Sequence, residues 1–292
     1  MLLMKSVLKY SSKFKLGDET MSECDHNCAS CSKNCSERKG IQKAQLNPYS
    51  KVNKVIGVIS GKGGVGKSLV TSLMAVAMQK EKKQVAILDG DITGPSIPKS
   101  FGVHTAIGGN DQGMYPAVTD TGIQMISTNL LLEQETQPVL LRGPIIGSMV
   151  AQFYTDVVWT DVDYMFVDMP PGTGDVALTV FQQLPVDGII IVTTPQELVG
   201  MIVEKAIVMA NMMNVPVLGI VENMSYVQCP DCEKKLYVFG ESHAQEICDK
   251  YGLELLAQIP LDPLTASLVD EGNIELADTS VLSKAVDKIK SL

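Results

Sequence analysis

The segment GKGGVGKS (61–68) constrains the fold of this chain more than any other feature of its sequence. It follows a short apolar run rich in β-branched residues, VIGVIS (55–60), and it opens a stretch with helical spacing that reaches about Lys80. In a glycine-rich loop between a buried strand and a helix, backbone N–H groups curl around phosphate oxygens and the helix dipole adds to the attraction. The segment therefore predicts a P-loop nucleotide site, and its context argues against a glycine-rich turn without a ligand.

The residues of this loop have separable roles. Lys67 is expected to neutralise the β- and γ-phosphates, and the Ser68 hydroxyl is expected to ligate Mg²⁺. Lys62 is a second lysine that phosphate binding in this pattern does not require, so it is either a solvated loop residue or a residue with another target. The residues expected to surround the nucleotide are Gly61, Lys62, Gly63, Gly64, Val65, Gly66, Lys67 and Ser68.

Two carboxylates stand where apolar runs end. Asp89 follows VAIL (85–88) and Asp168 follows YMFV (164–167), and each is followed by a segment rich in glycine and proline. A lone carboxylate at such a place can cap the next helix, but two of them favour the Mg²⁺ shell of a P-loop enzyme. Asp91, two residues after Asp89, is the candidate that positions the attacking water.

The order of apolar runs predicts the fold class. Strands are expected at 55–60, 85–88, 123–127, 164–167, 188–192, 215–221 and 255–259, with helices at 147–158, 176–184, 197–213 and 241–251. This alternation predicts an α/β fold. We expect a mostly parallel, doubly wound P-loop NTPase sheet with helices on both faces, preceded by a short cysteine-rich N-terminal segment. Ligands of such a sheet bind beyond the carboxyl ends of its strands.

The chain divides into four parts by composition. Residues 1–20, which carry four lysines before any acid, are expected to be a non-native start or a disordered tail before Met21, with an organellar presequence as the alternative. Residues 21–40 form a four-cysteine metal or cluster segment, and the polar residues 41–53 form a linker. Residues 54–292 are expected to form the ATPase domain.

The seven cysteines are grouped, which is typical of metal ligation in a reducing cytoplasm rather than of a secreted disulfide scaffold. Cys24, Cys28, Cys31 and Cys35 can wrap one small cluster or one zinc ion. Cys229 and Cys232 form a C-x2-C pair, which supplies only half of a closed four-ligand site, so a two-fold symmetric dimer would supply the rest. Half of a zinc ribbon and a reducible pair are the alternatives, and Cys248 is expected in the core.

Several of these motifs together resemble a known group. GKGGVGKS with Lys62, LDGDITGPS (88–96) and VDMPPGTGD (167–175) look like the deviant Walker A ATPases, which include MinD, ParA, the arsenical pump ATPase and the nitrogenase iron protein. This resemblance implies that Lys62 reaches across a nucleotide-sandwich dimer to the partner's phosphates, as an arginine finger would.

The segment VENMSYVQCPDC (221–232) narrows the resemblance to the Mrp/Nbp (ApbC-type) iron–sulfur cluster carrier ATPases, over about residues 52–292. The resemblance implies an ATP-hydrolysing homodimer that bridges a 4Fe–4S cluster through Cys229 and Cys232 and transfers it to apoproteins. It also implies that Asn223 contacts the adenine. Such relatives space their N-terminal cysteines more widely, so cluster and zinc both stay open for Cys24–Cys35.

Other functions fit less well. The formal charge of −9, from 24 basic and 33 acidic residues, disfavours nucleic acid as a partner. The longest apolar runs are too short for stable membrane insertion. We expect the C-terminal segment 280–292 and the methionine-rich stretch 201–213 to pack on their own domain.

A positioning or regulatory switch of the MinD/ParA kind is the chief alternative, but it leaves six cysteines in two groups unexplained. A reductase like the nitrogenase iron protein is the second alternative. Its cluster cysteines lie far apart in the sequence and not as a C-x2-C pair, which counts against it.

Overall fold

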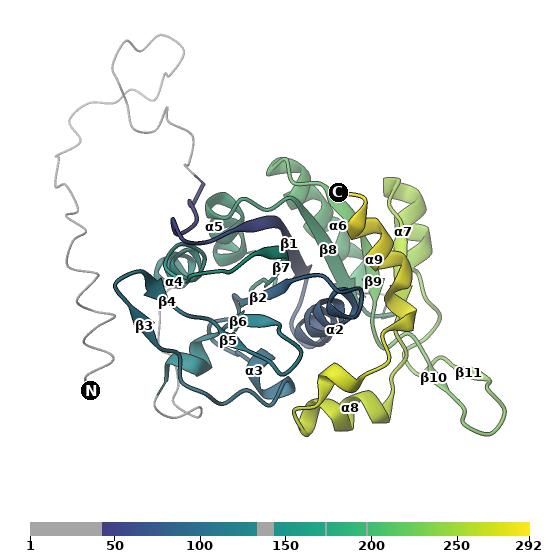
Figure 1. Cartoon of the computed structure of the whole chain (residues 1–292). Coiled ribbons are helices and arrows are strands. Elements are labelled where there is room, and N and C mark those ends of the chain that lie inside the picture. Colours follow the sequence, from purple (N-terminus) through teal and green to yellow (C-terminus); the bar gives the residue numbers. More distant parts are fainter. Residues whose placement is uncertain (1–42, 133–142, 173, 197) are drawn as a thin grey trace, which may run out of the picture. The chain divides into compact units, whose positions relative to one another are not determined.

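An eight-stranded sheet forms the centre of the computed structural model, which describes residues 43–132, 143–172, 174–196 and 198–292 (Figure 1). The strand order is β12-β9-β8-β1-β7-β2-β6-β5. The strands are β1 (Val52–Ser60), β2 (Val85–Asp89), β5 (Ala117–Val118), β6 (Gln124–Ile126), β7 (Val162–Asp168), β8 (Gly188–Thr193), β9 (Val217–Glu222) and β12 (Leu255–Gln258). Neighbours are parallel except β5 with β6, so the predicted α/β fold with a mostly parallel sheet is confirmed.

Helices cover both faces of this sheet because alternate residues of each strand point to opposite sides. On β1, Ile56 and Val58 join the core cluster that contains α2 and α9, while Val55 and Ile59 join the cluster that contains α4 to α7. The helices are α2 (Lys67–Lys80), α3 (Ile97–Ser100), α4 (Gly143–Thr155), α5 (Asp175–Gln183), α6 (Leu198–Met212), α7 (Ala244–Tyr251), α8 (Pro263–Asp270) and α9 (Ser283–Lys290).

The expected elements are present, with shifts at their ends. The helix expected at 147–158 begins four residues earlier, at Gly143. The short strands β3 (Gly109–Asn110), β4 (Gly113–Met114), β5, β10 (Val227–Gln228) and β11 (Lys235–Leu236) were not expected, because two residues carry no periodicity. None of the described helices combines the length and the apolar character needed to cross a membrane.

Two expected core segments differ from each other. α9 buries Ala285, Val286 and Ile289 against the sheet, so the prediction that the C-terminal segment packs on its own domain is confirmed. On α6, Met209 is buried, but Met201 and Met212 are 60% and 78% exposed. The prediction of core packing is wrong for these two methionines, because the helix turns them to its outer face.

The described part of the expected linker lies on the domain. The Lys43 ammonium donates to the carbonyl oxygens of Phe181 and Leu184 at 2.6 and 3.0 Å, and the Ala44 N–H donates to Gln183 at 2.7 Å. Lys43 and Ala44 therefore lie against the end of α5. Ser50 Oγ and the Lys51 N–H then donate to carbonyl oxygens of the segment 157–159, before β1 begins at Val52. The expected tail 1–20 and the cysteine segment 21–40 lie outside the described residues.

Candidate nucleotide and metal sites

The P-loop backbone forms an anion cradle between β1 and α2. Gly64 and Gly66 have φ values of 82° and 78°, a left-handed conformation that glycine adopts without strain. A Cβ at Gly66 would lie 2.1 Å from Asn223 Nδ2, so no side chain fits there. Among the described residues no side chain caps α2, which leaves its first N–H groups available to a phosphate.

A cleft of about 430 Å³ opens over this cradle. Five of the predicted nucleotide-binding residues line it: Gly63, Gly64, Gly66, Lys67 and Ser68. Asp91, Lys99, Pro171 and Asp270 complete much of the wall from other elements. Sequence reasoning missed Lys99 and Asp270, because neither lies in a motif and α8 brings Asp270 to the cleft from the far end of the chain.

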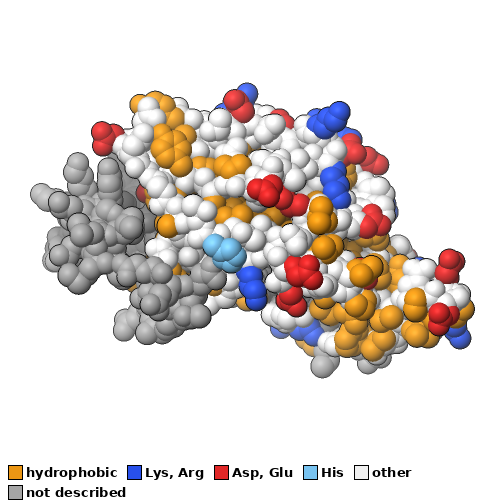
Figure 2. Space-filling view, turned by 60° about the horizontal axis from the view of Figure 1, so that its bottom comes forward, with side chains coloured by type: hydrophobic (Ala, Val, Ile, Leu, Met, Phe, Trp, Pro, Cys, Tyr) orange, Lys and Arg blue, Asp and Glu red, His pale blue; other side chains and the backbone are white. Residues whose placement is uncertain are grey.

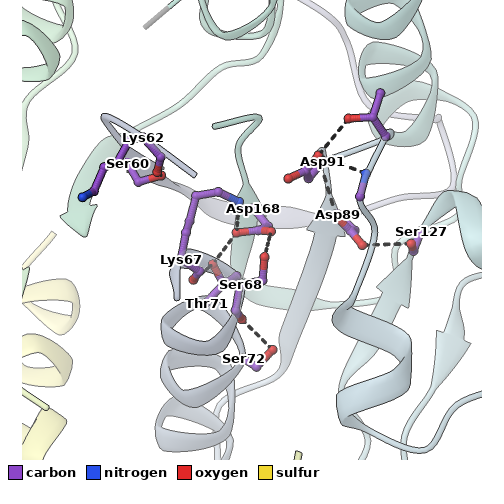
Figure 3. A network of polar contacts seen from close by, with 12 residues as sticks. Ser60, Lys62, Lys67, Ser68, Thr71, Ser72, Asp89, Asp91, Ser127 and Asp168 are labelled. Atoms are coloured by element: carbon purple, nitrogen blue, oxygen red, sulfur yellow. Dashed lines mark hydrogen bonds and ion pairs between the residues drawn. The ribbon is translucent and has the colours of Figure 1, made fainter. Parts of the chain in front are cut away.

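Asp168 collects three groups from the first turns of α2 (Figure 3). Lys67 Nζ lies 2.7 Å from Asp168 Oδ1, and the two side chains are 6% and 0% exposed. Ser68 Oγ donates to Oδ2 at 2.6 Å and Thr71 Oγ1 donates to Oδ1 at 2.8 Å. Lys67 Nζ has this ion pair but no hydrogen bond of good angular geometry within the described residues, so its donors suit a phosphate. Thr71 was missed, although it lies one helical turn after Lys67.

Asp89 and Asp168 stand side by side, as partners in the β2–β7 register. Asp89 is buried and accepts hydrogen bonds from Ser127 Oγ at 2.9 Å and from the Asp91 N–H at 3.2 Å. Burial, and then the nearby charge of Asp168, raise the pKa of Asp89 to about 8. The carboxylate oxygens of Asp89 and Asp168, together with the Ser68 hydroxyl, are oxygen ligands of the kind that Mg²⁺ takes.

Asp91 lies at the rim of the cleft, where it accepts hydrogen bonds from Thr93 Oγ1 and the Gly94 N–H, both at 3.3 Å. Lys62 lies apart from these groups. Its ammonium donates to Gln196 Oε1 at 2.7 Å, and its side chain points away from Lys67 and Asp168 (Figure 3). The structure thus gives Lys62 a partner in its own chain, which the sequence did not indicate.

Asn223 connects the end of β9 to the P-loop. Its Nδ2 donates to the Val65 carbonyl oxygen at 3.0 Å, its backbone N–H donates to Thr193, and the side chain is 1% exposed. The sequence associated Asn223 with the nucleotide only through a resemblance. The contact with the loop backbone carried no sequence signal, because the two segments are 158 residues apart.

The C-x2-C pair occupies the turn between β10 and β11. The Cys229 N–H donates to the Lys234 carbonyl oxygen at 3.0 Å, and the Glu233 N–H donates to the Cys229 carbonyl oxygen at 2.9 Å. The backbone N–H of Asp231, then that of Cys232 and the Cys232 thiol, lower the pKa of Cys229. Hydrogen bonds to sulfur favour the thiolate, which is the form that ligates metals. Cys229 is half-buried and Cys232 is exposed, so both can reach a ligand.

The hairpin supplies two ligands and no more. Within the described ranges, no cluster of three or more His, Cys, Asp or Glu side chains could hold a metal ion. Cys24, Cys28, Cys31 and Cys35 lie outside those ranges. Cys248 is fully buried, and burial raises its pKa to about 11, so its expected place in the core is confirmed.

Comparison with known proteins adds to this geometry. Residues 51–291 match the family described as ParA, NUBPL iron-transfer P-loop NTPase. The chain belongs to this family. Two of its similar relatives are named iron-sulfur cluster carrier protein. One, from Methanocaldococcus jannaschii, is 44% identical over 86% of this chain and 90% of its own. The other, from Clostridium perfringens, is 41% identical over 85% and 90%.

Solved structures agree with this family assignment. The nucleotide-binding protein of Archaeoglobus fulgidus in complex with ADP is 43% identical, with a TM-score of 0.70 over 78% of this chain and 89% of that one. MinD of Aquifex aeolicus, solved with MinC, is 18% identical, with a TM-score of 0.60 over 82% and 96%. At that identity the likeness to MinD shows the fold alone. The resemblance to iron–sulfur carrier ATPases is confirmed as membership of the iron-transfer P-loop NTPases.

Proposed function

We propose that this protein binds and hydrolyses ATP and carries an iron–sulfur cluster to apoproteins, in the cytoplasm. The observation that carries the proposal is the thiol pair. Backbone N–H groups of Asp231 and Cys232 stabilise the Cys229 thiolate. The pair follows the carboxyl end of β9, at the same edge of the sheet where the P-loop follows β1. Two relatives that cover most of the chain are named as cluster carriers. A positioning switch of the MinD kind shares the fold, but it has no use for this hairpin.

At the nucleotide site, Lys67 binds phosphate oxygens and Ser68 and Asp168 hold Mg²⁺, with Asp89 beside them. Mg²⁺ would neutralise the charge that develops on the phosphates. Asp91 positions the attacking water from the rim of the cleft, where its carboxylate is accessible. Asn223, already against the P-loop, contacts the adenine.

At the metal site, Cys229 and Cys232 provide two thiolates per chain, whereas a 4Fe–4S cluster takes four. A two-fold symmetric homodimer supplies the second pair. Cys24, Cys28, Cys31 and Cys35 hold a second cluster or a zinc ion.

Lys62 belongs to this dimer in the same proposal. Replacing Lys62 by alanine is expected to weaken ATP-dependent dimerisation at least about tenfold, because the side chain acts on the partner's phosphates. ADP binding by the monomer is expected to persist, since Lys62 makes no contact with Lys67 or Asp168 in the described contacts. Sedimentation velocity with ATP measures the change, and the control is Lys51→Ala, which removes an exposed lysine just before β1. Dimerisation equal to that of the control would contradict the role in trans.

Cluster transfer tests the main function. Anaerobic incubation with iron and sulfide is expected to give a protein with bound iron, acid-labile sulfide and a visible iron–sulfur absorption. Mixing it with an apoenzyme that requires a 4Fe–4S cluster should restore that enzyme's activity, even with an iron chelator in solution. A protein that takes up only zinc, or that leaves the acceptor inactive, would rule out the carrier function.

A further inference from the structure

The cysteine hairpin has no core of its own. All residues from 230 to 241 are exposed, and no side chain from 226 to 243 belongs to the buried apolar clusters of the described residues. Figure 1 shows β10 and β11 extending from the body, and Figure 2 shows hydrophobic side chains gathered at the surface on that side. A two-stranded hairpin of this kind is marginally stable alone. Its direction must therefore be set by polar contacts at its base.

Glu222 lies at that base. It is the last residue of β9 and is 1% exposed. Its Oε2 accepts hydrogen bonds from Ser225 Oγ and from Gln258 Nε2, the latter at 2.9 Å. Its Oε1 accepts a hydrogen bond from Ser242 Oγ at 2.7 Å. One carboxylate thus joins the residue where the hairpin segment leaves the sheet to the residue where that segment returns.

The two ends of the segment are held differently. At the start, backbone hydrogen bonds join Ser225 to Ile259 and Leu261 to Tyr226, at 2.9 and 2.8 Å. At the return, the bond from Ser242 to Glu222 is the contact among the described residues that ties 237–242 to the sheet. Loss of the carboxylate would leave the start attached by its backbone hydrogen bonds, whereas the return would be held only from Ala244 onward, where helix α7 begins.

The contacts of the Glu222 carboxylate are those of a buried structural residue and not those of a surface ion pair. Within the described part of the chain, Glu222 has no cationic partner and is satisfied by three neutral donors. Hydrogen bonds to a buried carboxylate are stronger than those between neutral groups. The next residue, Asn223, donates to the P-loop backbone, so one of two adjacent residues contacts the nucleotide loop and the other contacts the base of the cysteine hairpin.

We propose that Glu222 is the positioning residue of the thiolate pair: it closes the base of the hairpin through Ser225 and Ser242 and so holds Cys229 and Cys232 in a metal-binding arrangement. The proposal rests on the proposed function, because it assigns the pair to a metal. Residues that hydrogen-bond a metal ligand directly change metal affinity by about 10- to 100-fold when they are replaced. Glu222 acts through Ser225 and Ser242 and not on a thiolate itself, so we expect a loss at the lower end of that range.

The test measures Co²⁺ affinity by its thiolate charge-transfer absorption, in a full-length chain whose Cys24, Cys28, Cys31 and Cys35 are serine. Glu222→Ala is expected to bind Co²⁺ at least about tenfold more weakly and to shift the d–d bands, which report coordination geometry. Glu222→Gln, which retains an acceptor oxygen, is expected to recover part of the affinity. ADP affinity, measured in the same proteins, reports whether the P-loop stays intact.

Two further variants make the result decisive. Glu241→Ala removes an exposed carboxylate from the same segment and is expected to bind Co²⁺ like the reference protein. Ser242→Ala removes one hydrogen bond and is expected to weaken binding even if Glu222→Ala does not fold. Affinities of Glu222→Ala or, failing that, Ser242→Ala within twofold of the Glu241→Ala value would overturn the proposal. A reference protein without any thiolate–cobalt absorption would overturn the proposed function itself.

Discussion

Replacing Lys67 by methionine is expected to destabilise the protein as well as to remove its affinity for phosphates. The lysine is the buried cationic partner of Asp168, and the carboxylate is fully buried. Removing one member of a buried ion pair leaves an uncompensated charge and costs about 3–5 kcal/mol. Because Ser68 and Thr71 still donate to Asp168, we expect a loss of about 3 kcal/mol in the free energy of unfolding, the lower end of that range.

Urea unfolding without nucleotide measures the stability term, and titration calorimetry with ADP measures binding. The matched control is Lys54→Met, which breaks the ion pair with Asp187 at 3.4 Å, where the side chains are 34% and 32% exposed. Partly exposed pairs contribute about 0–1 kcal/mol, so the control should lose far less stability and keep its affinity for ADP. Equal losses in the two variants would show that the Lys67–Asp168 pair is no more than a surface contact.

The double replacement Cys229→Ala/Cys232→Ala is expected to abolish the cluster iron held by the hairpin. Two thiolates per chain are lost at once, so the proposed dimer would retain none of the four ligands that a cluster takes. The fold should survive, because Cys232 is exposed, Cys229 is half-buried and neither belongs to the core clusters. Affinity for ADP should also be unchanged.

Iron and sulfide counts after anaerobic reconstitution measure this loss. Cys248→Ala, which removes a fully buried thiol, is the matched control and should keep its iron. The serine variant at Cys24, Cys28, Cys31 and Cys35 reports the iron that the hairpins hold without the N-terminal cysteines. A double variant that keeps all of its iron would show that the hairpin is not the cluster site.

Much of the nucleotide site could be predicted because its chemistry is local. The glycines that need a left-handed backbone, the lysine that faces phosphate and the hydroxyl that follows it lie within eight residues between a strand and a helix. Asp89 and Asp168 were also accessible to prediction, since parallel strands bring their carboxyl ends to one edge. The two-residue strands β10 and β11 were not, because a hairpin that short has no hydrophobic pattern.

The sequence by itself determined the fold class, the nucleotide loop and the presence of a two-thiol motif, because each depends on the type and spacing of neighbouring residues. Only the tertiary structure decided which distant groups serve them. It pairs Lys67 with Asp168, sets Ser127 on Asp89, places Asn223 on the P-loop and closes the cysteine hairpin on Glu222. These contacts have no sequence signature because a buried polar group accepts any suitable partner that the packing of the sheet brings within hydrogen-bonding distance.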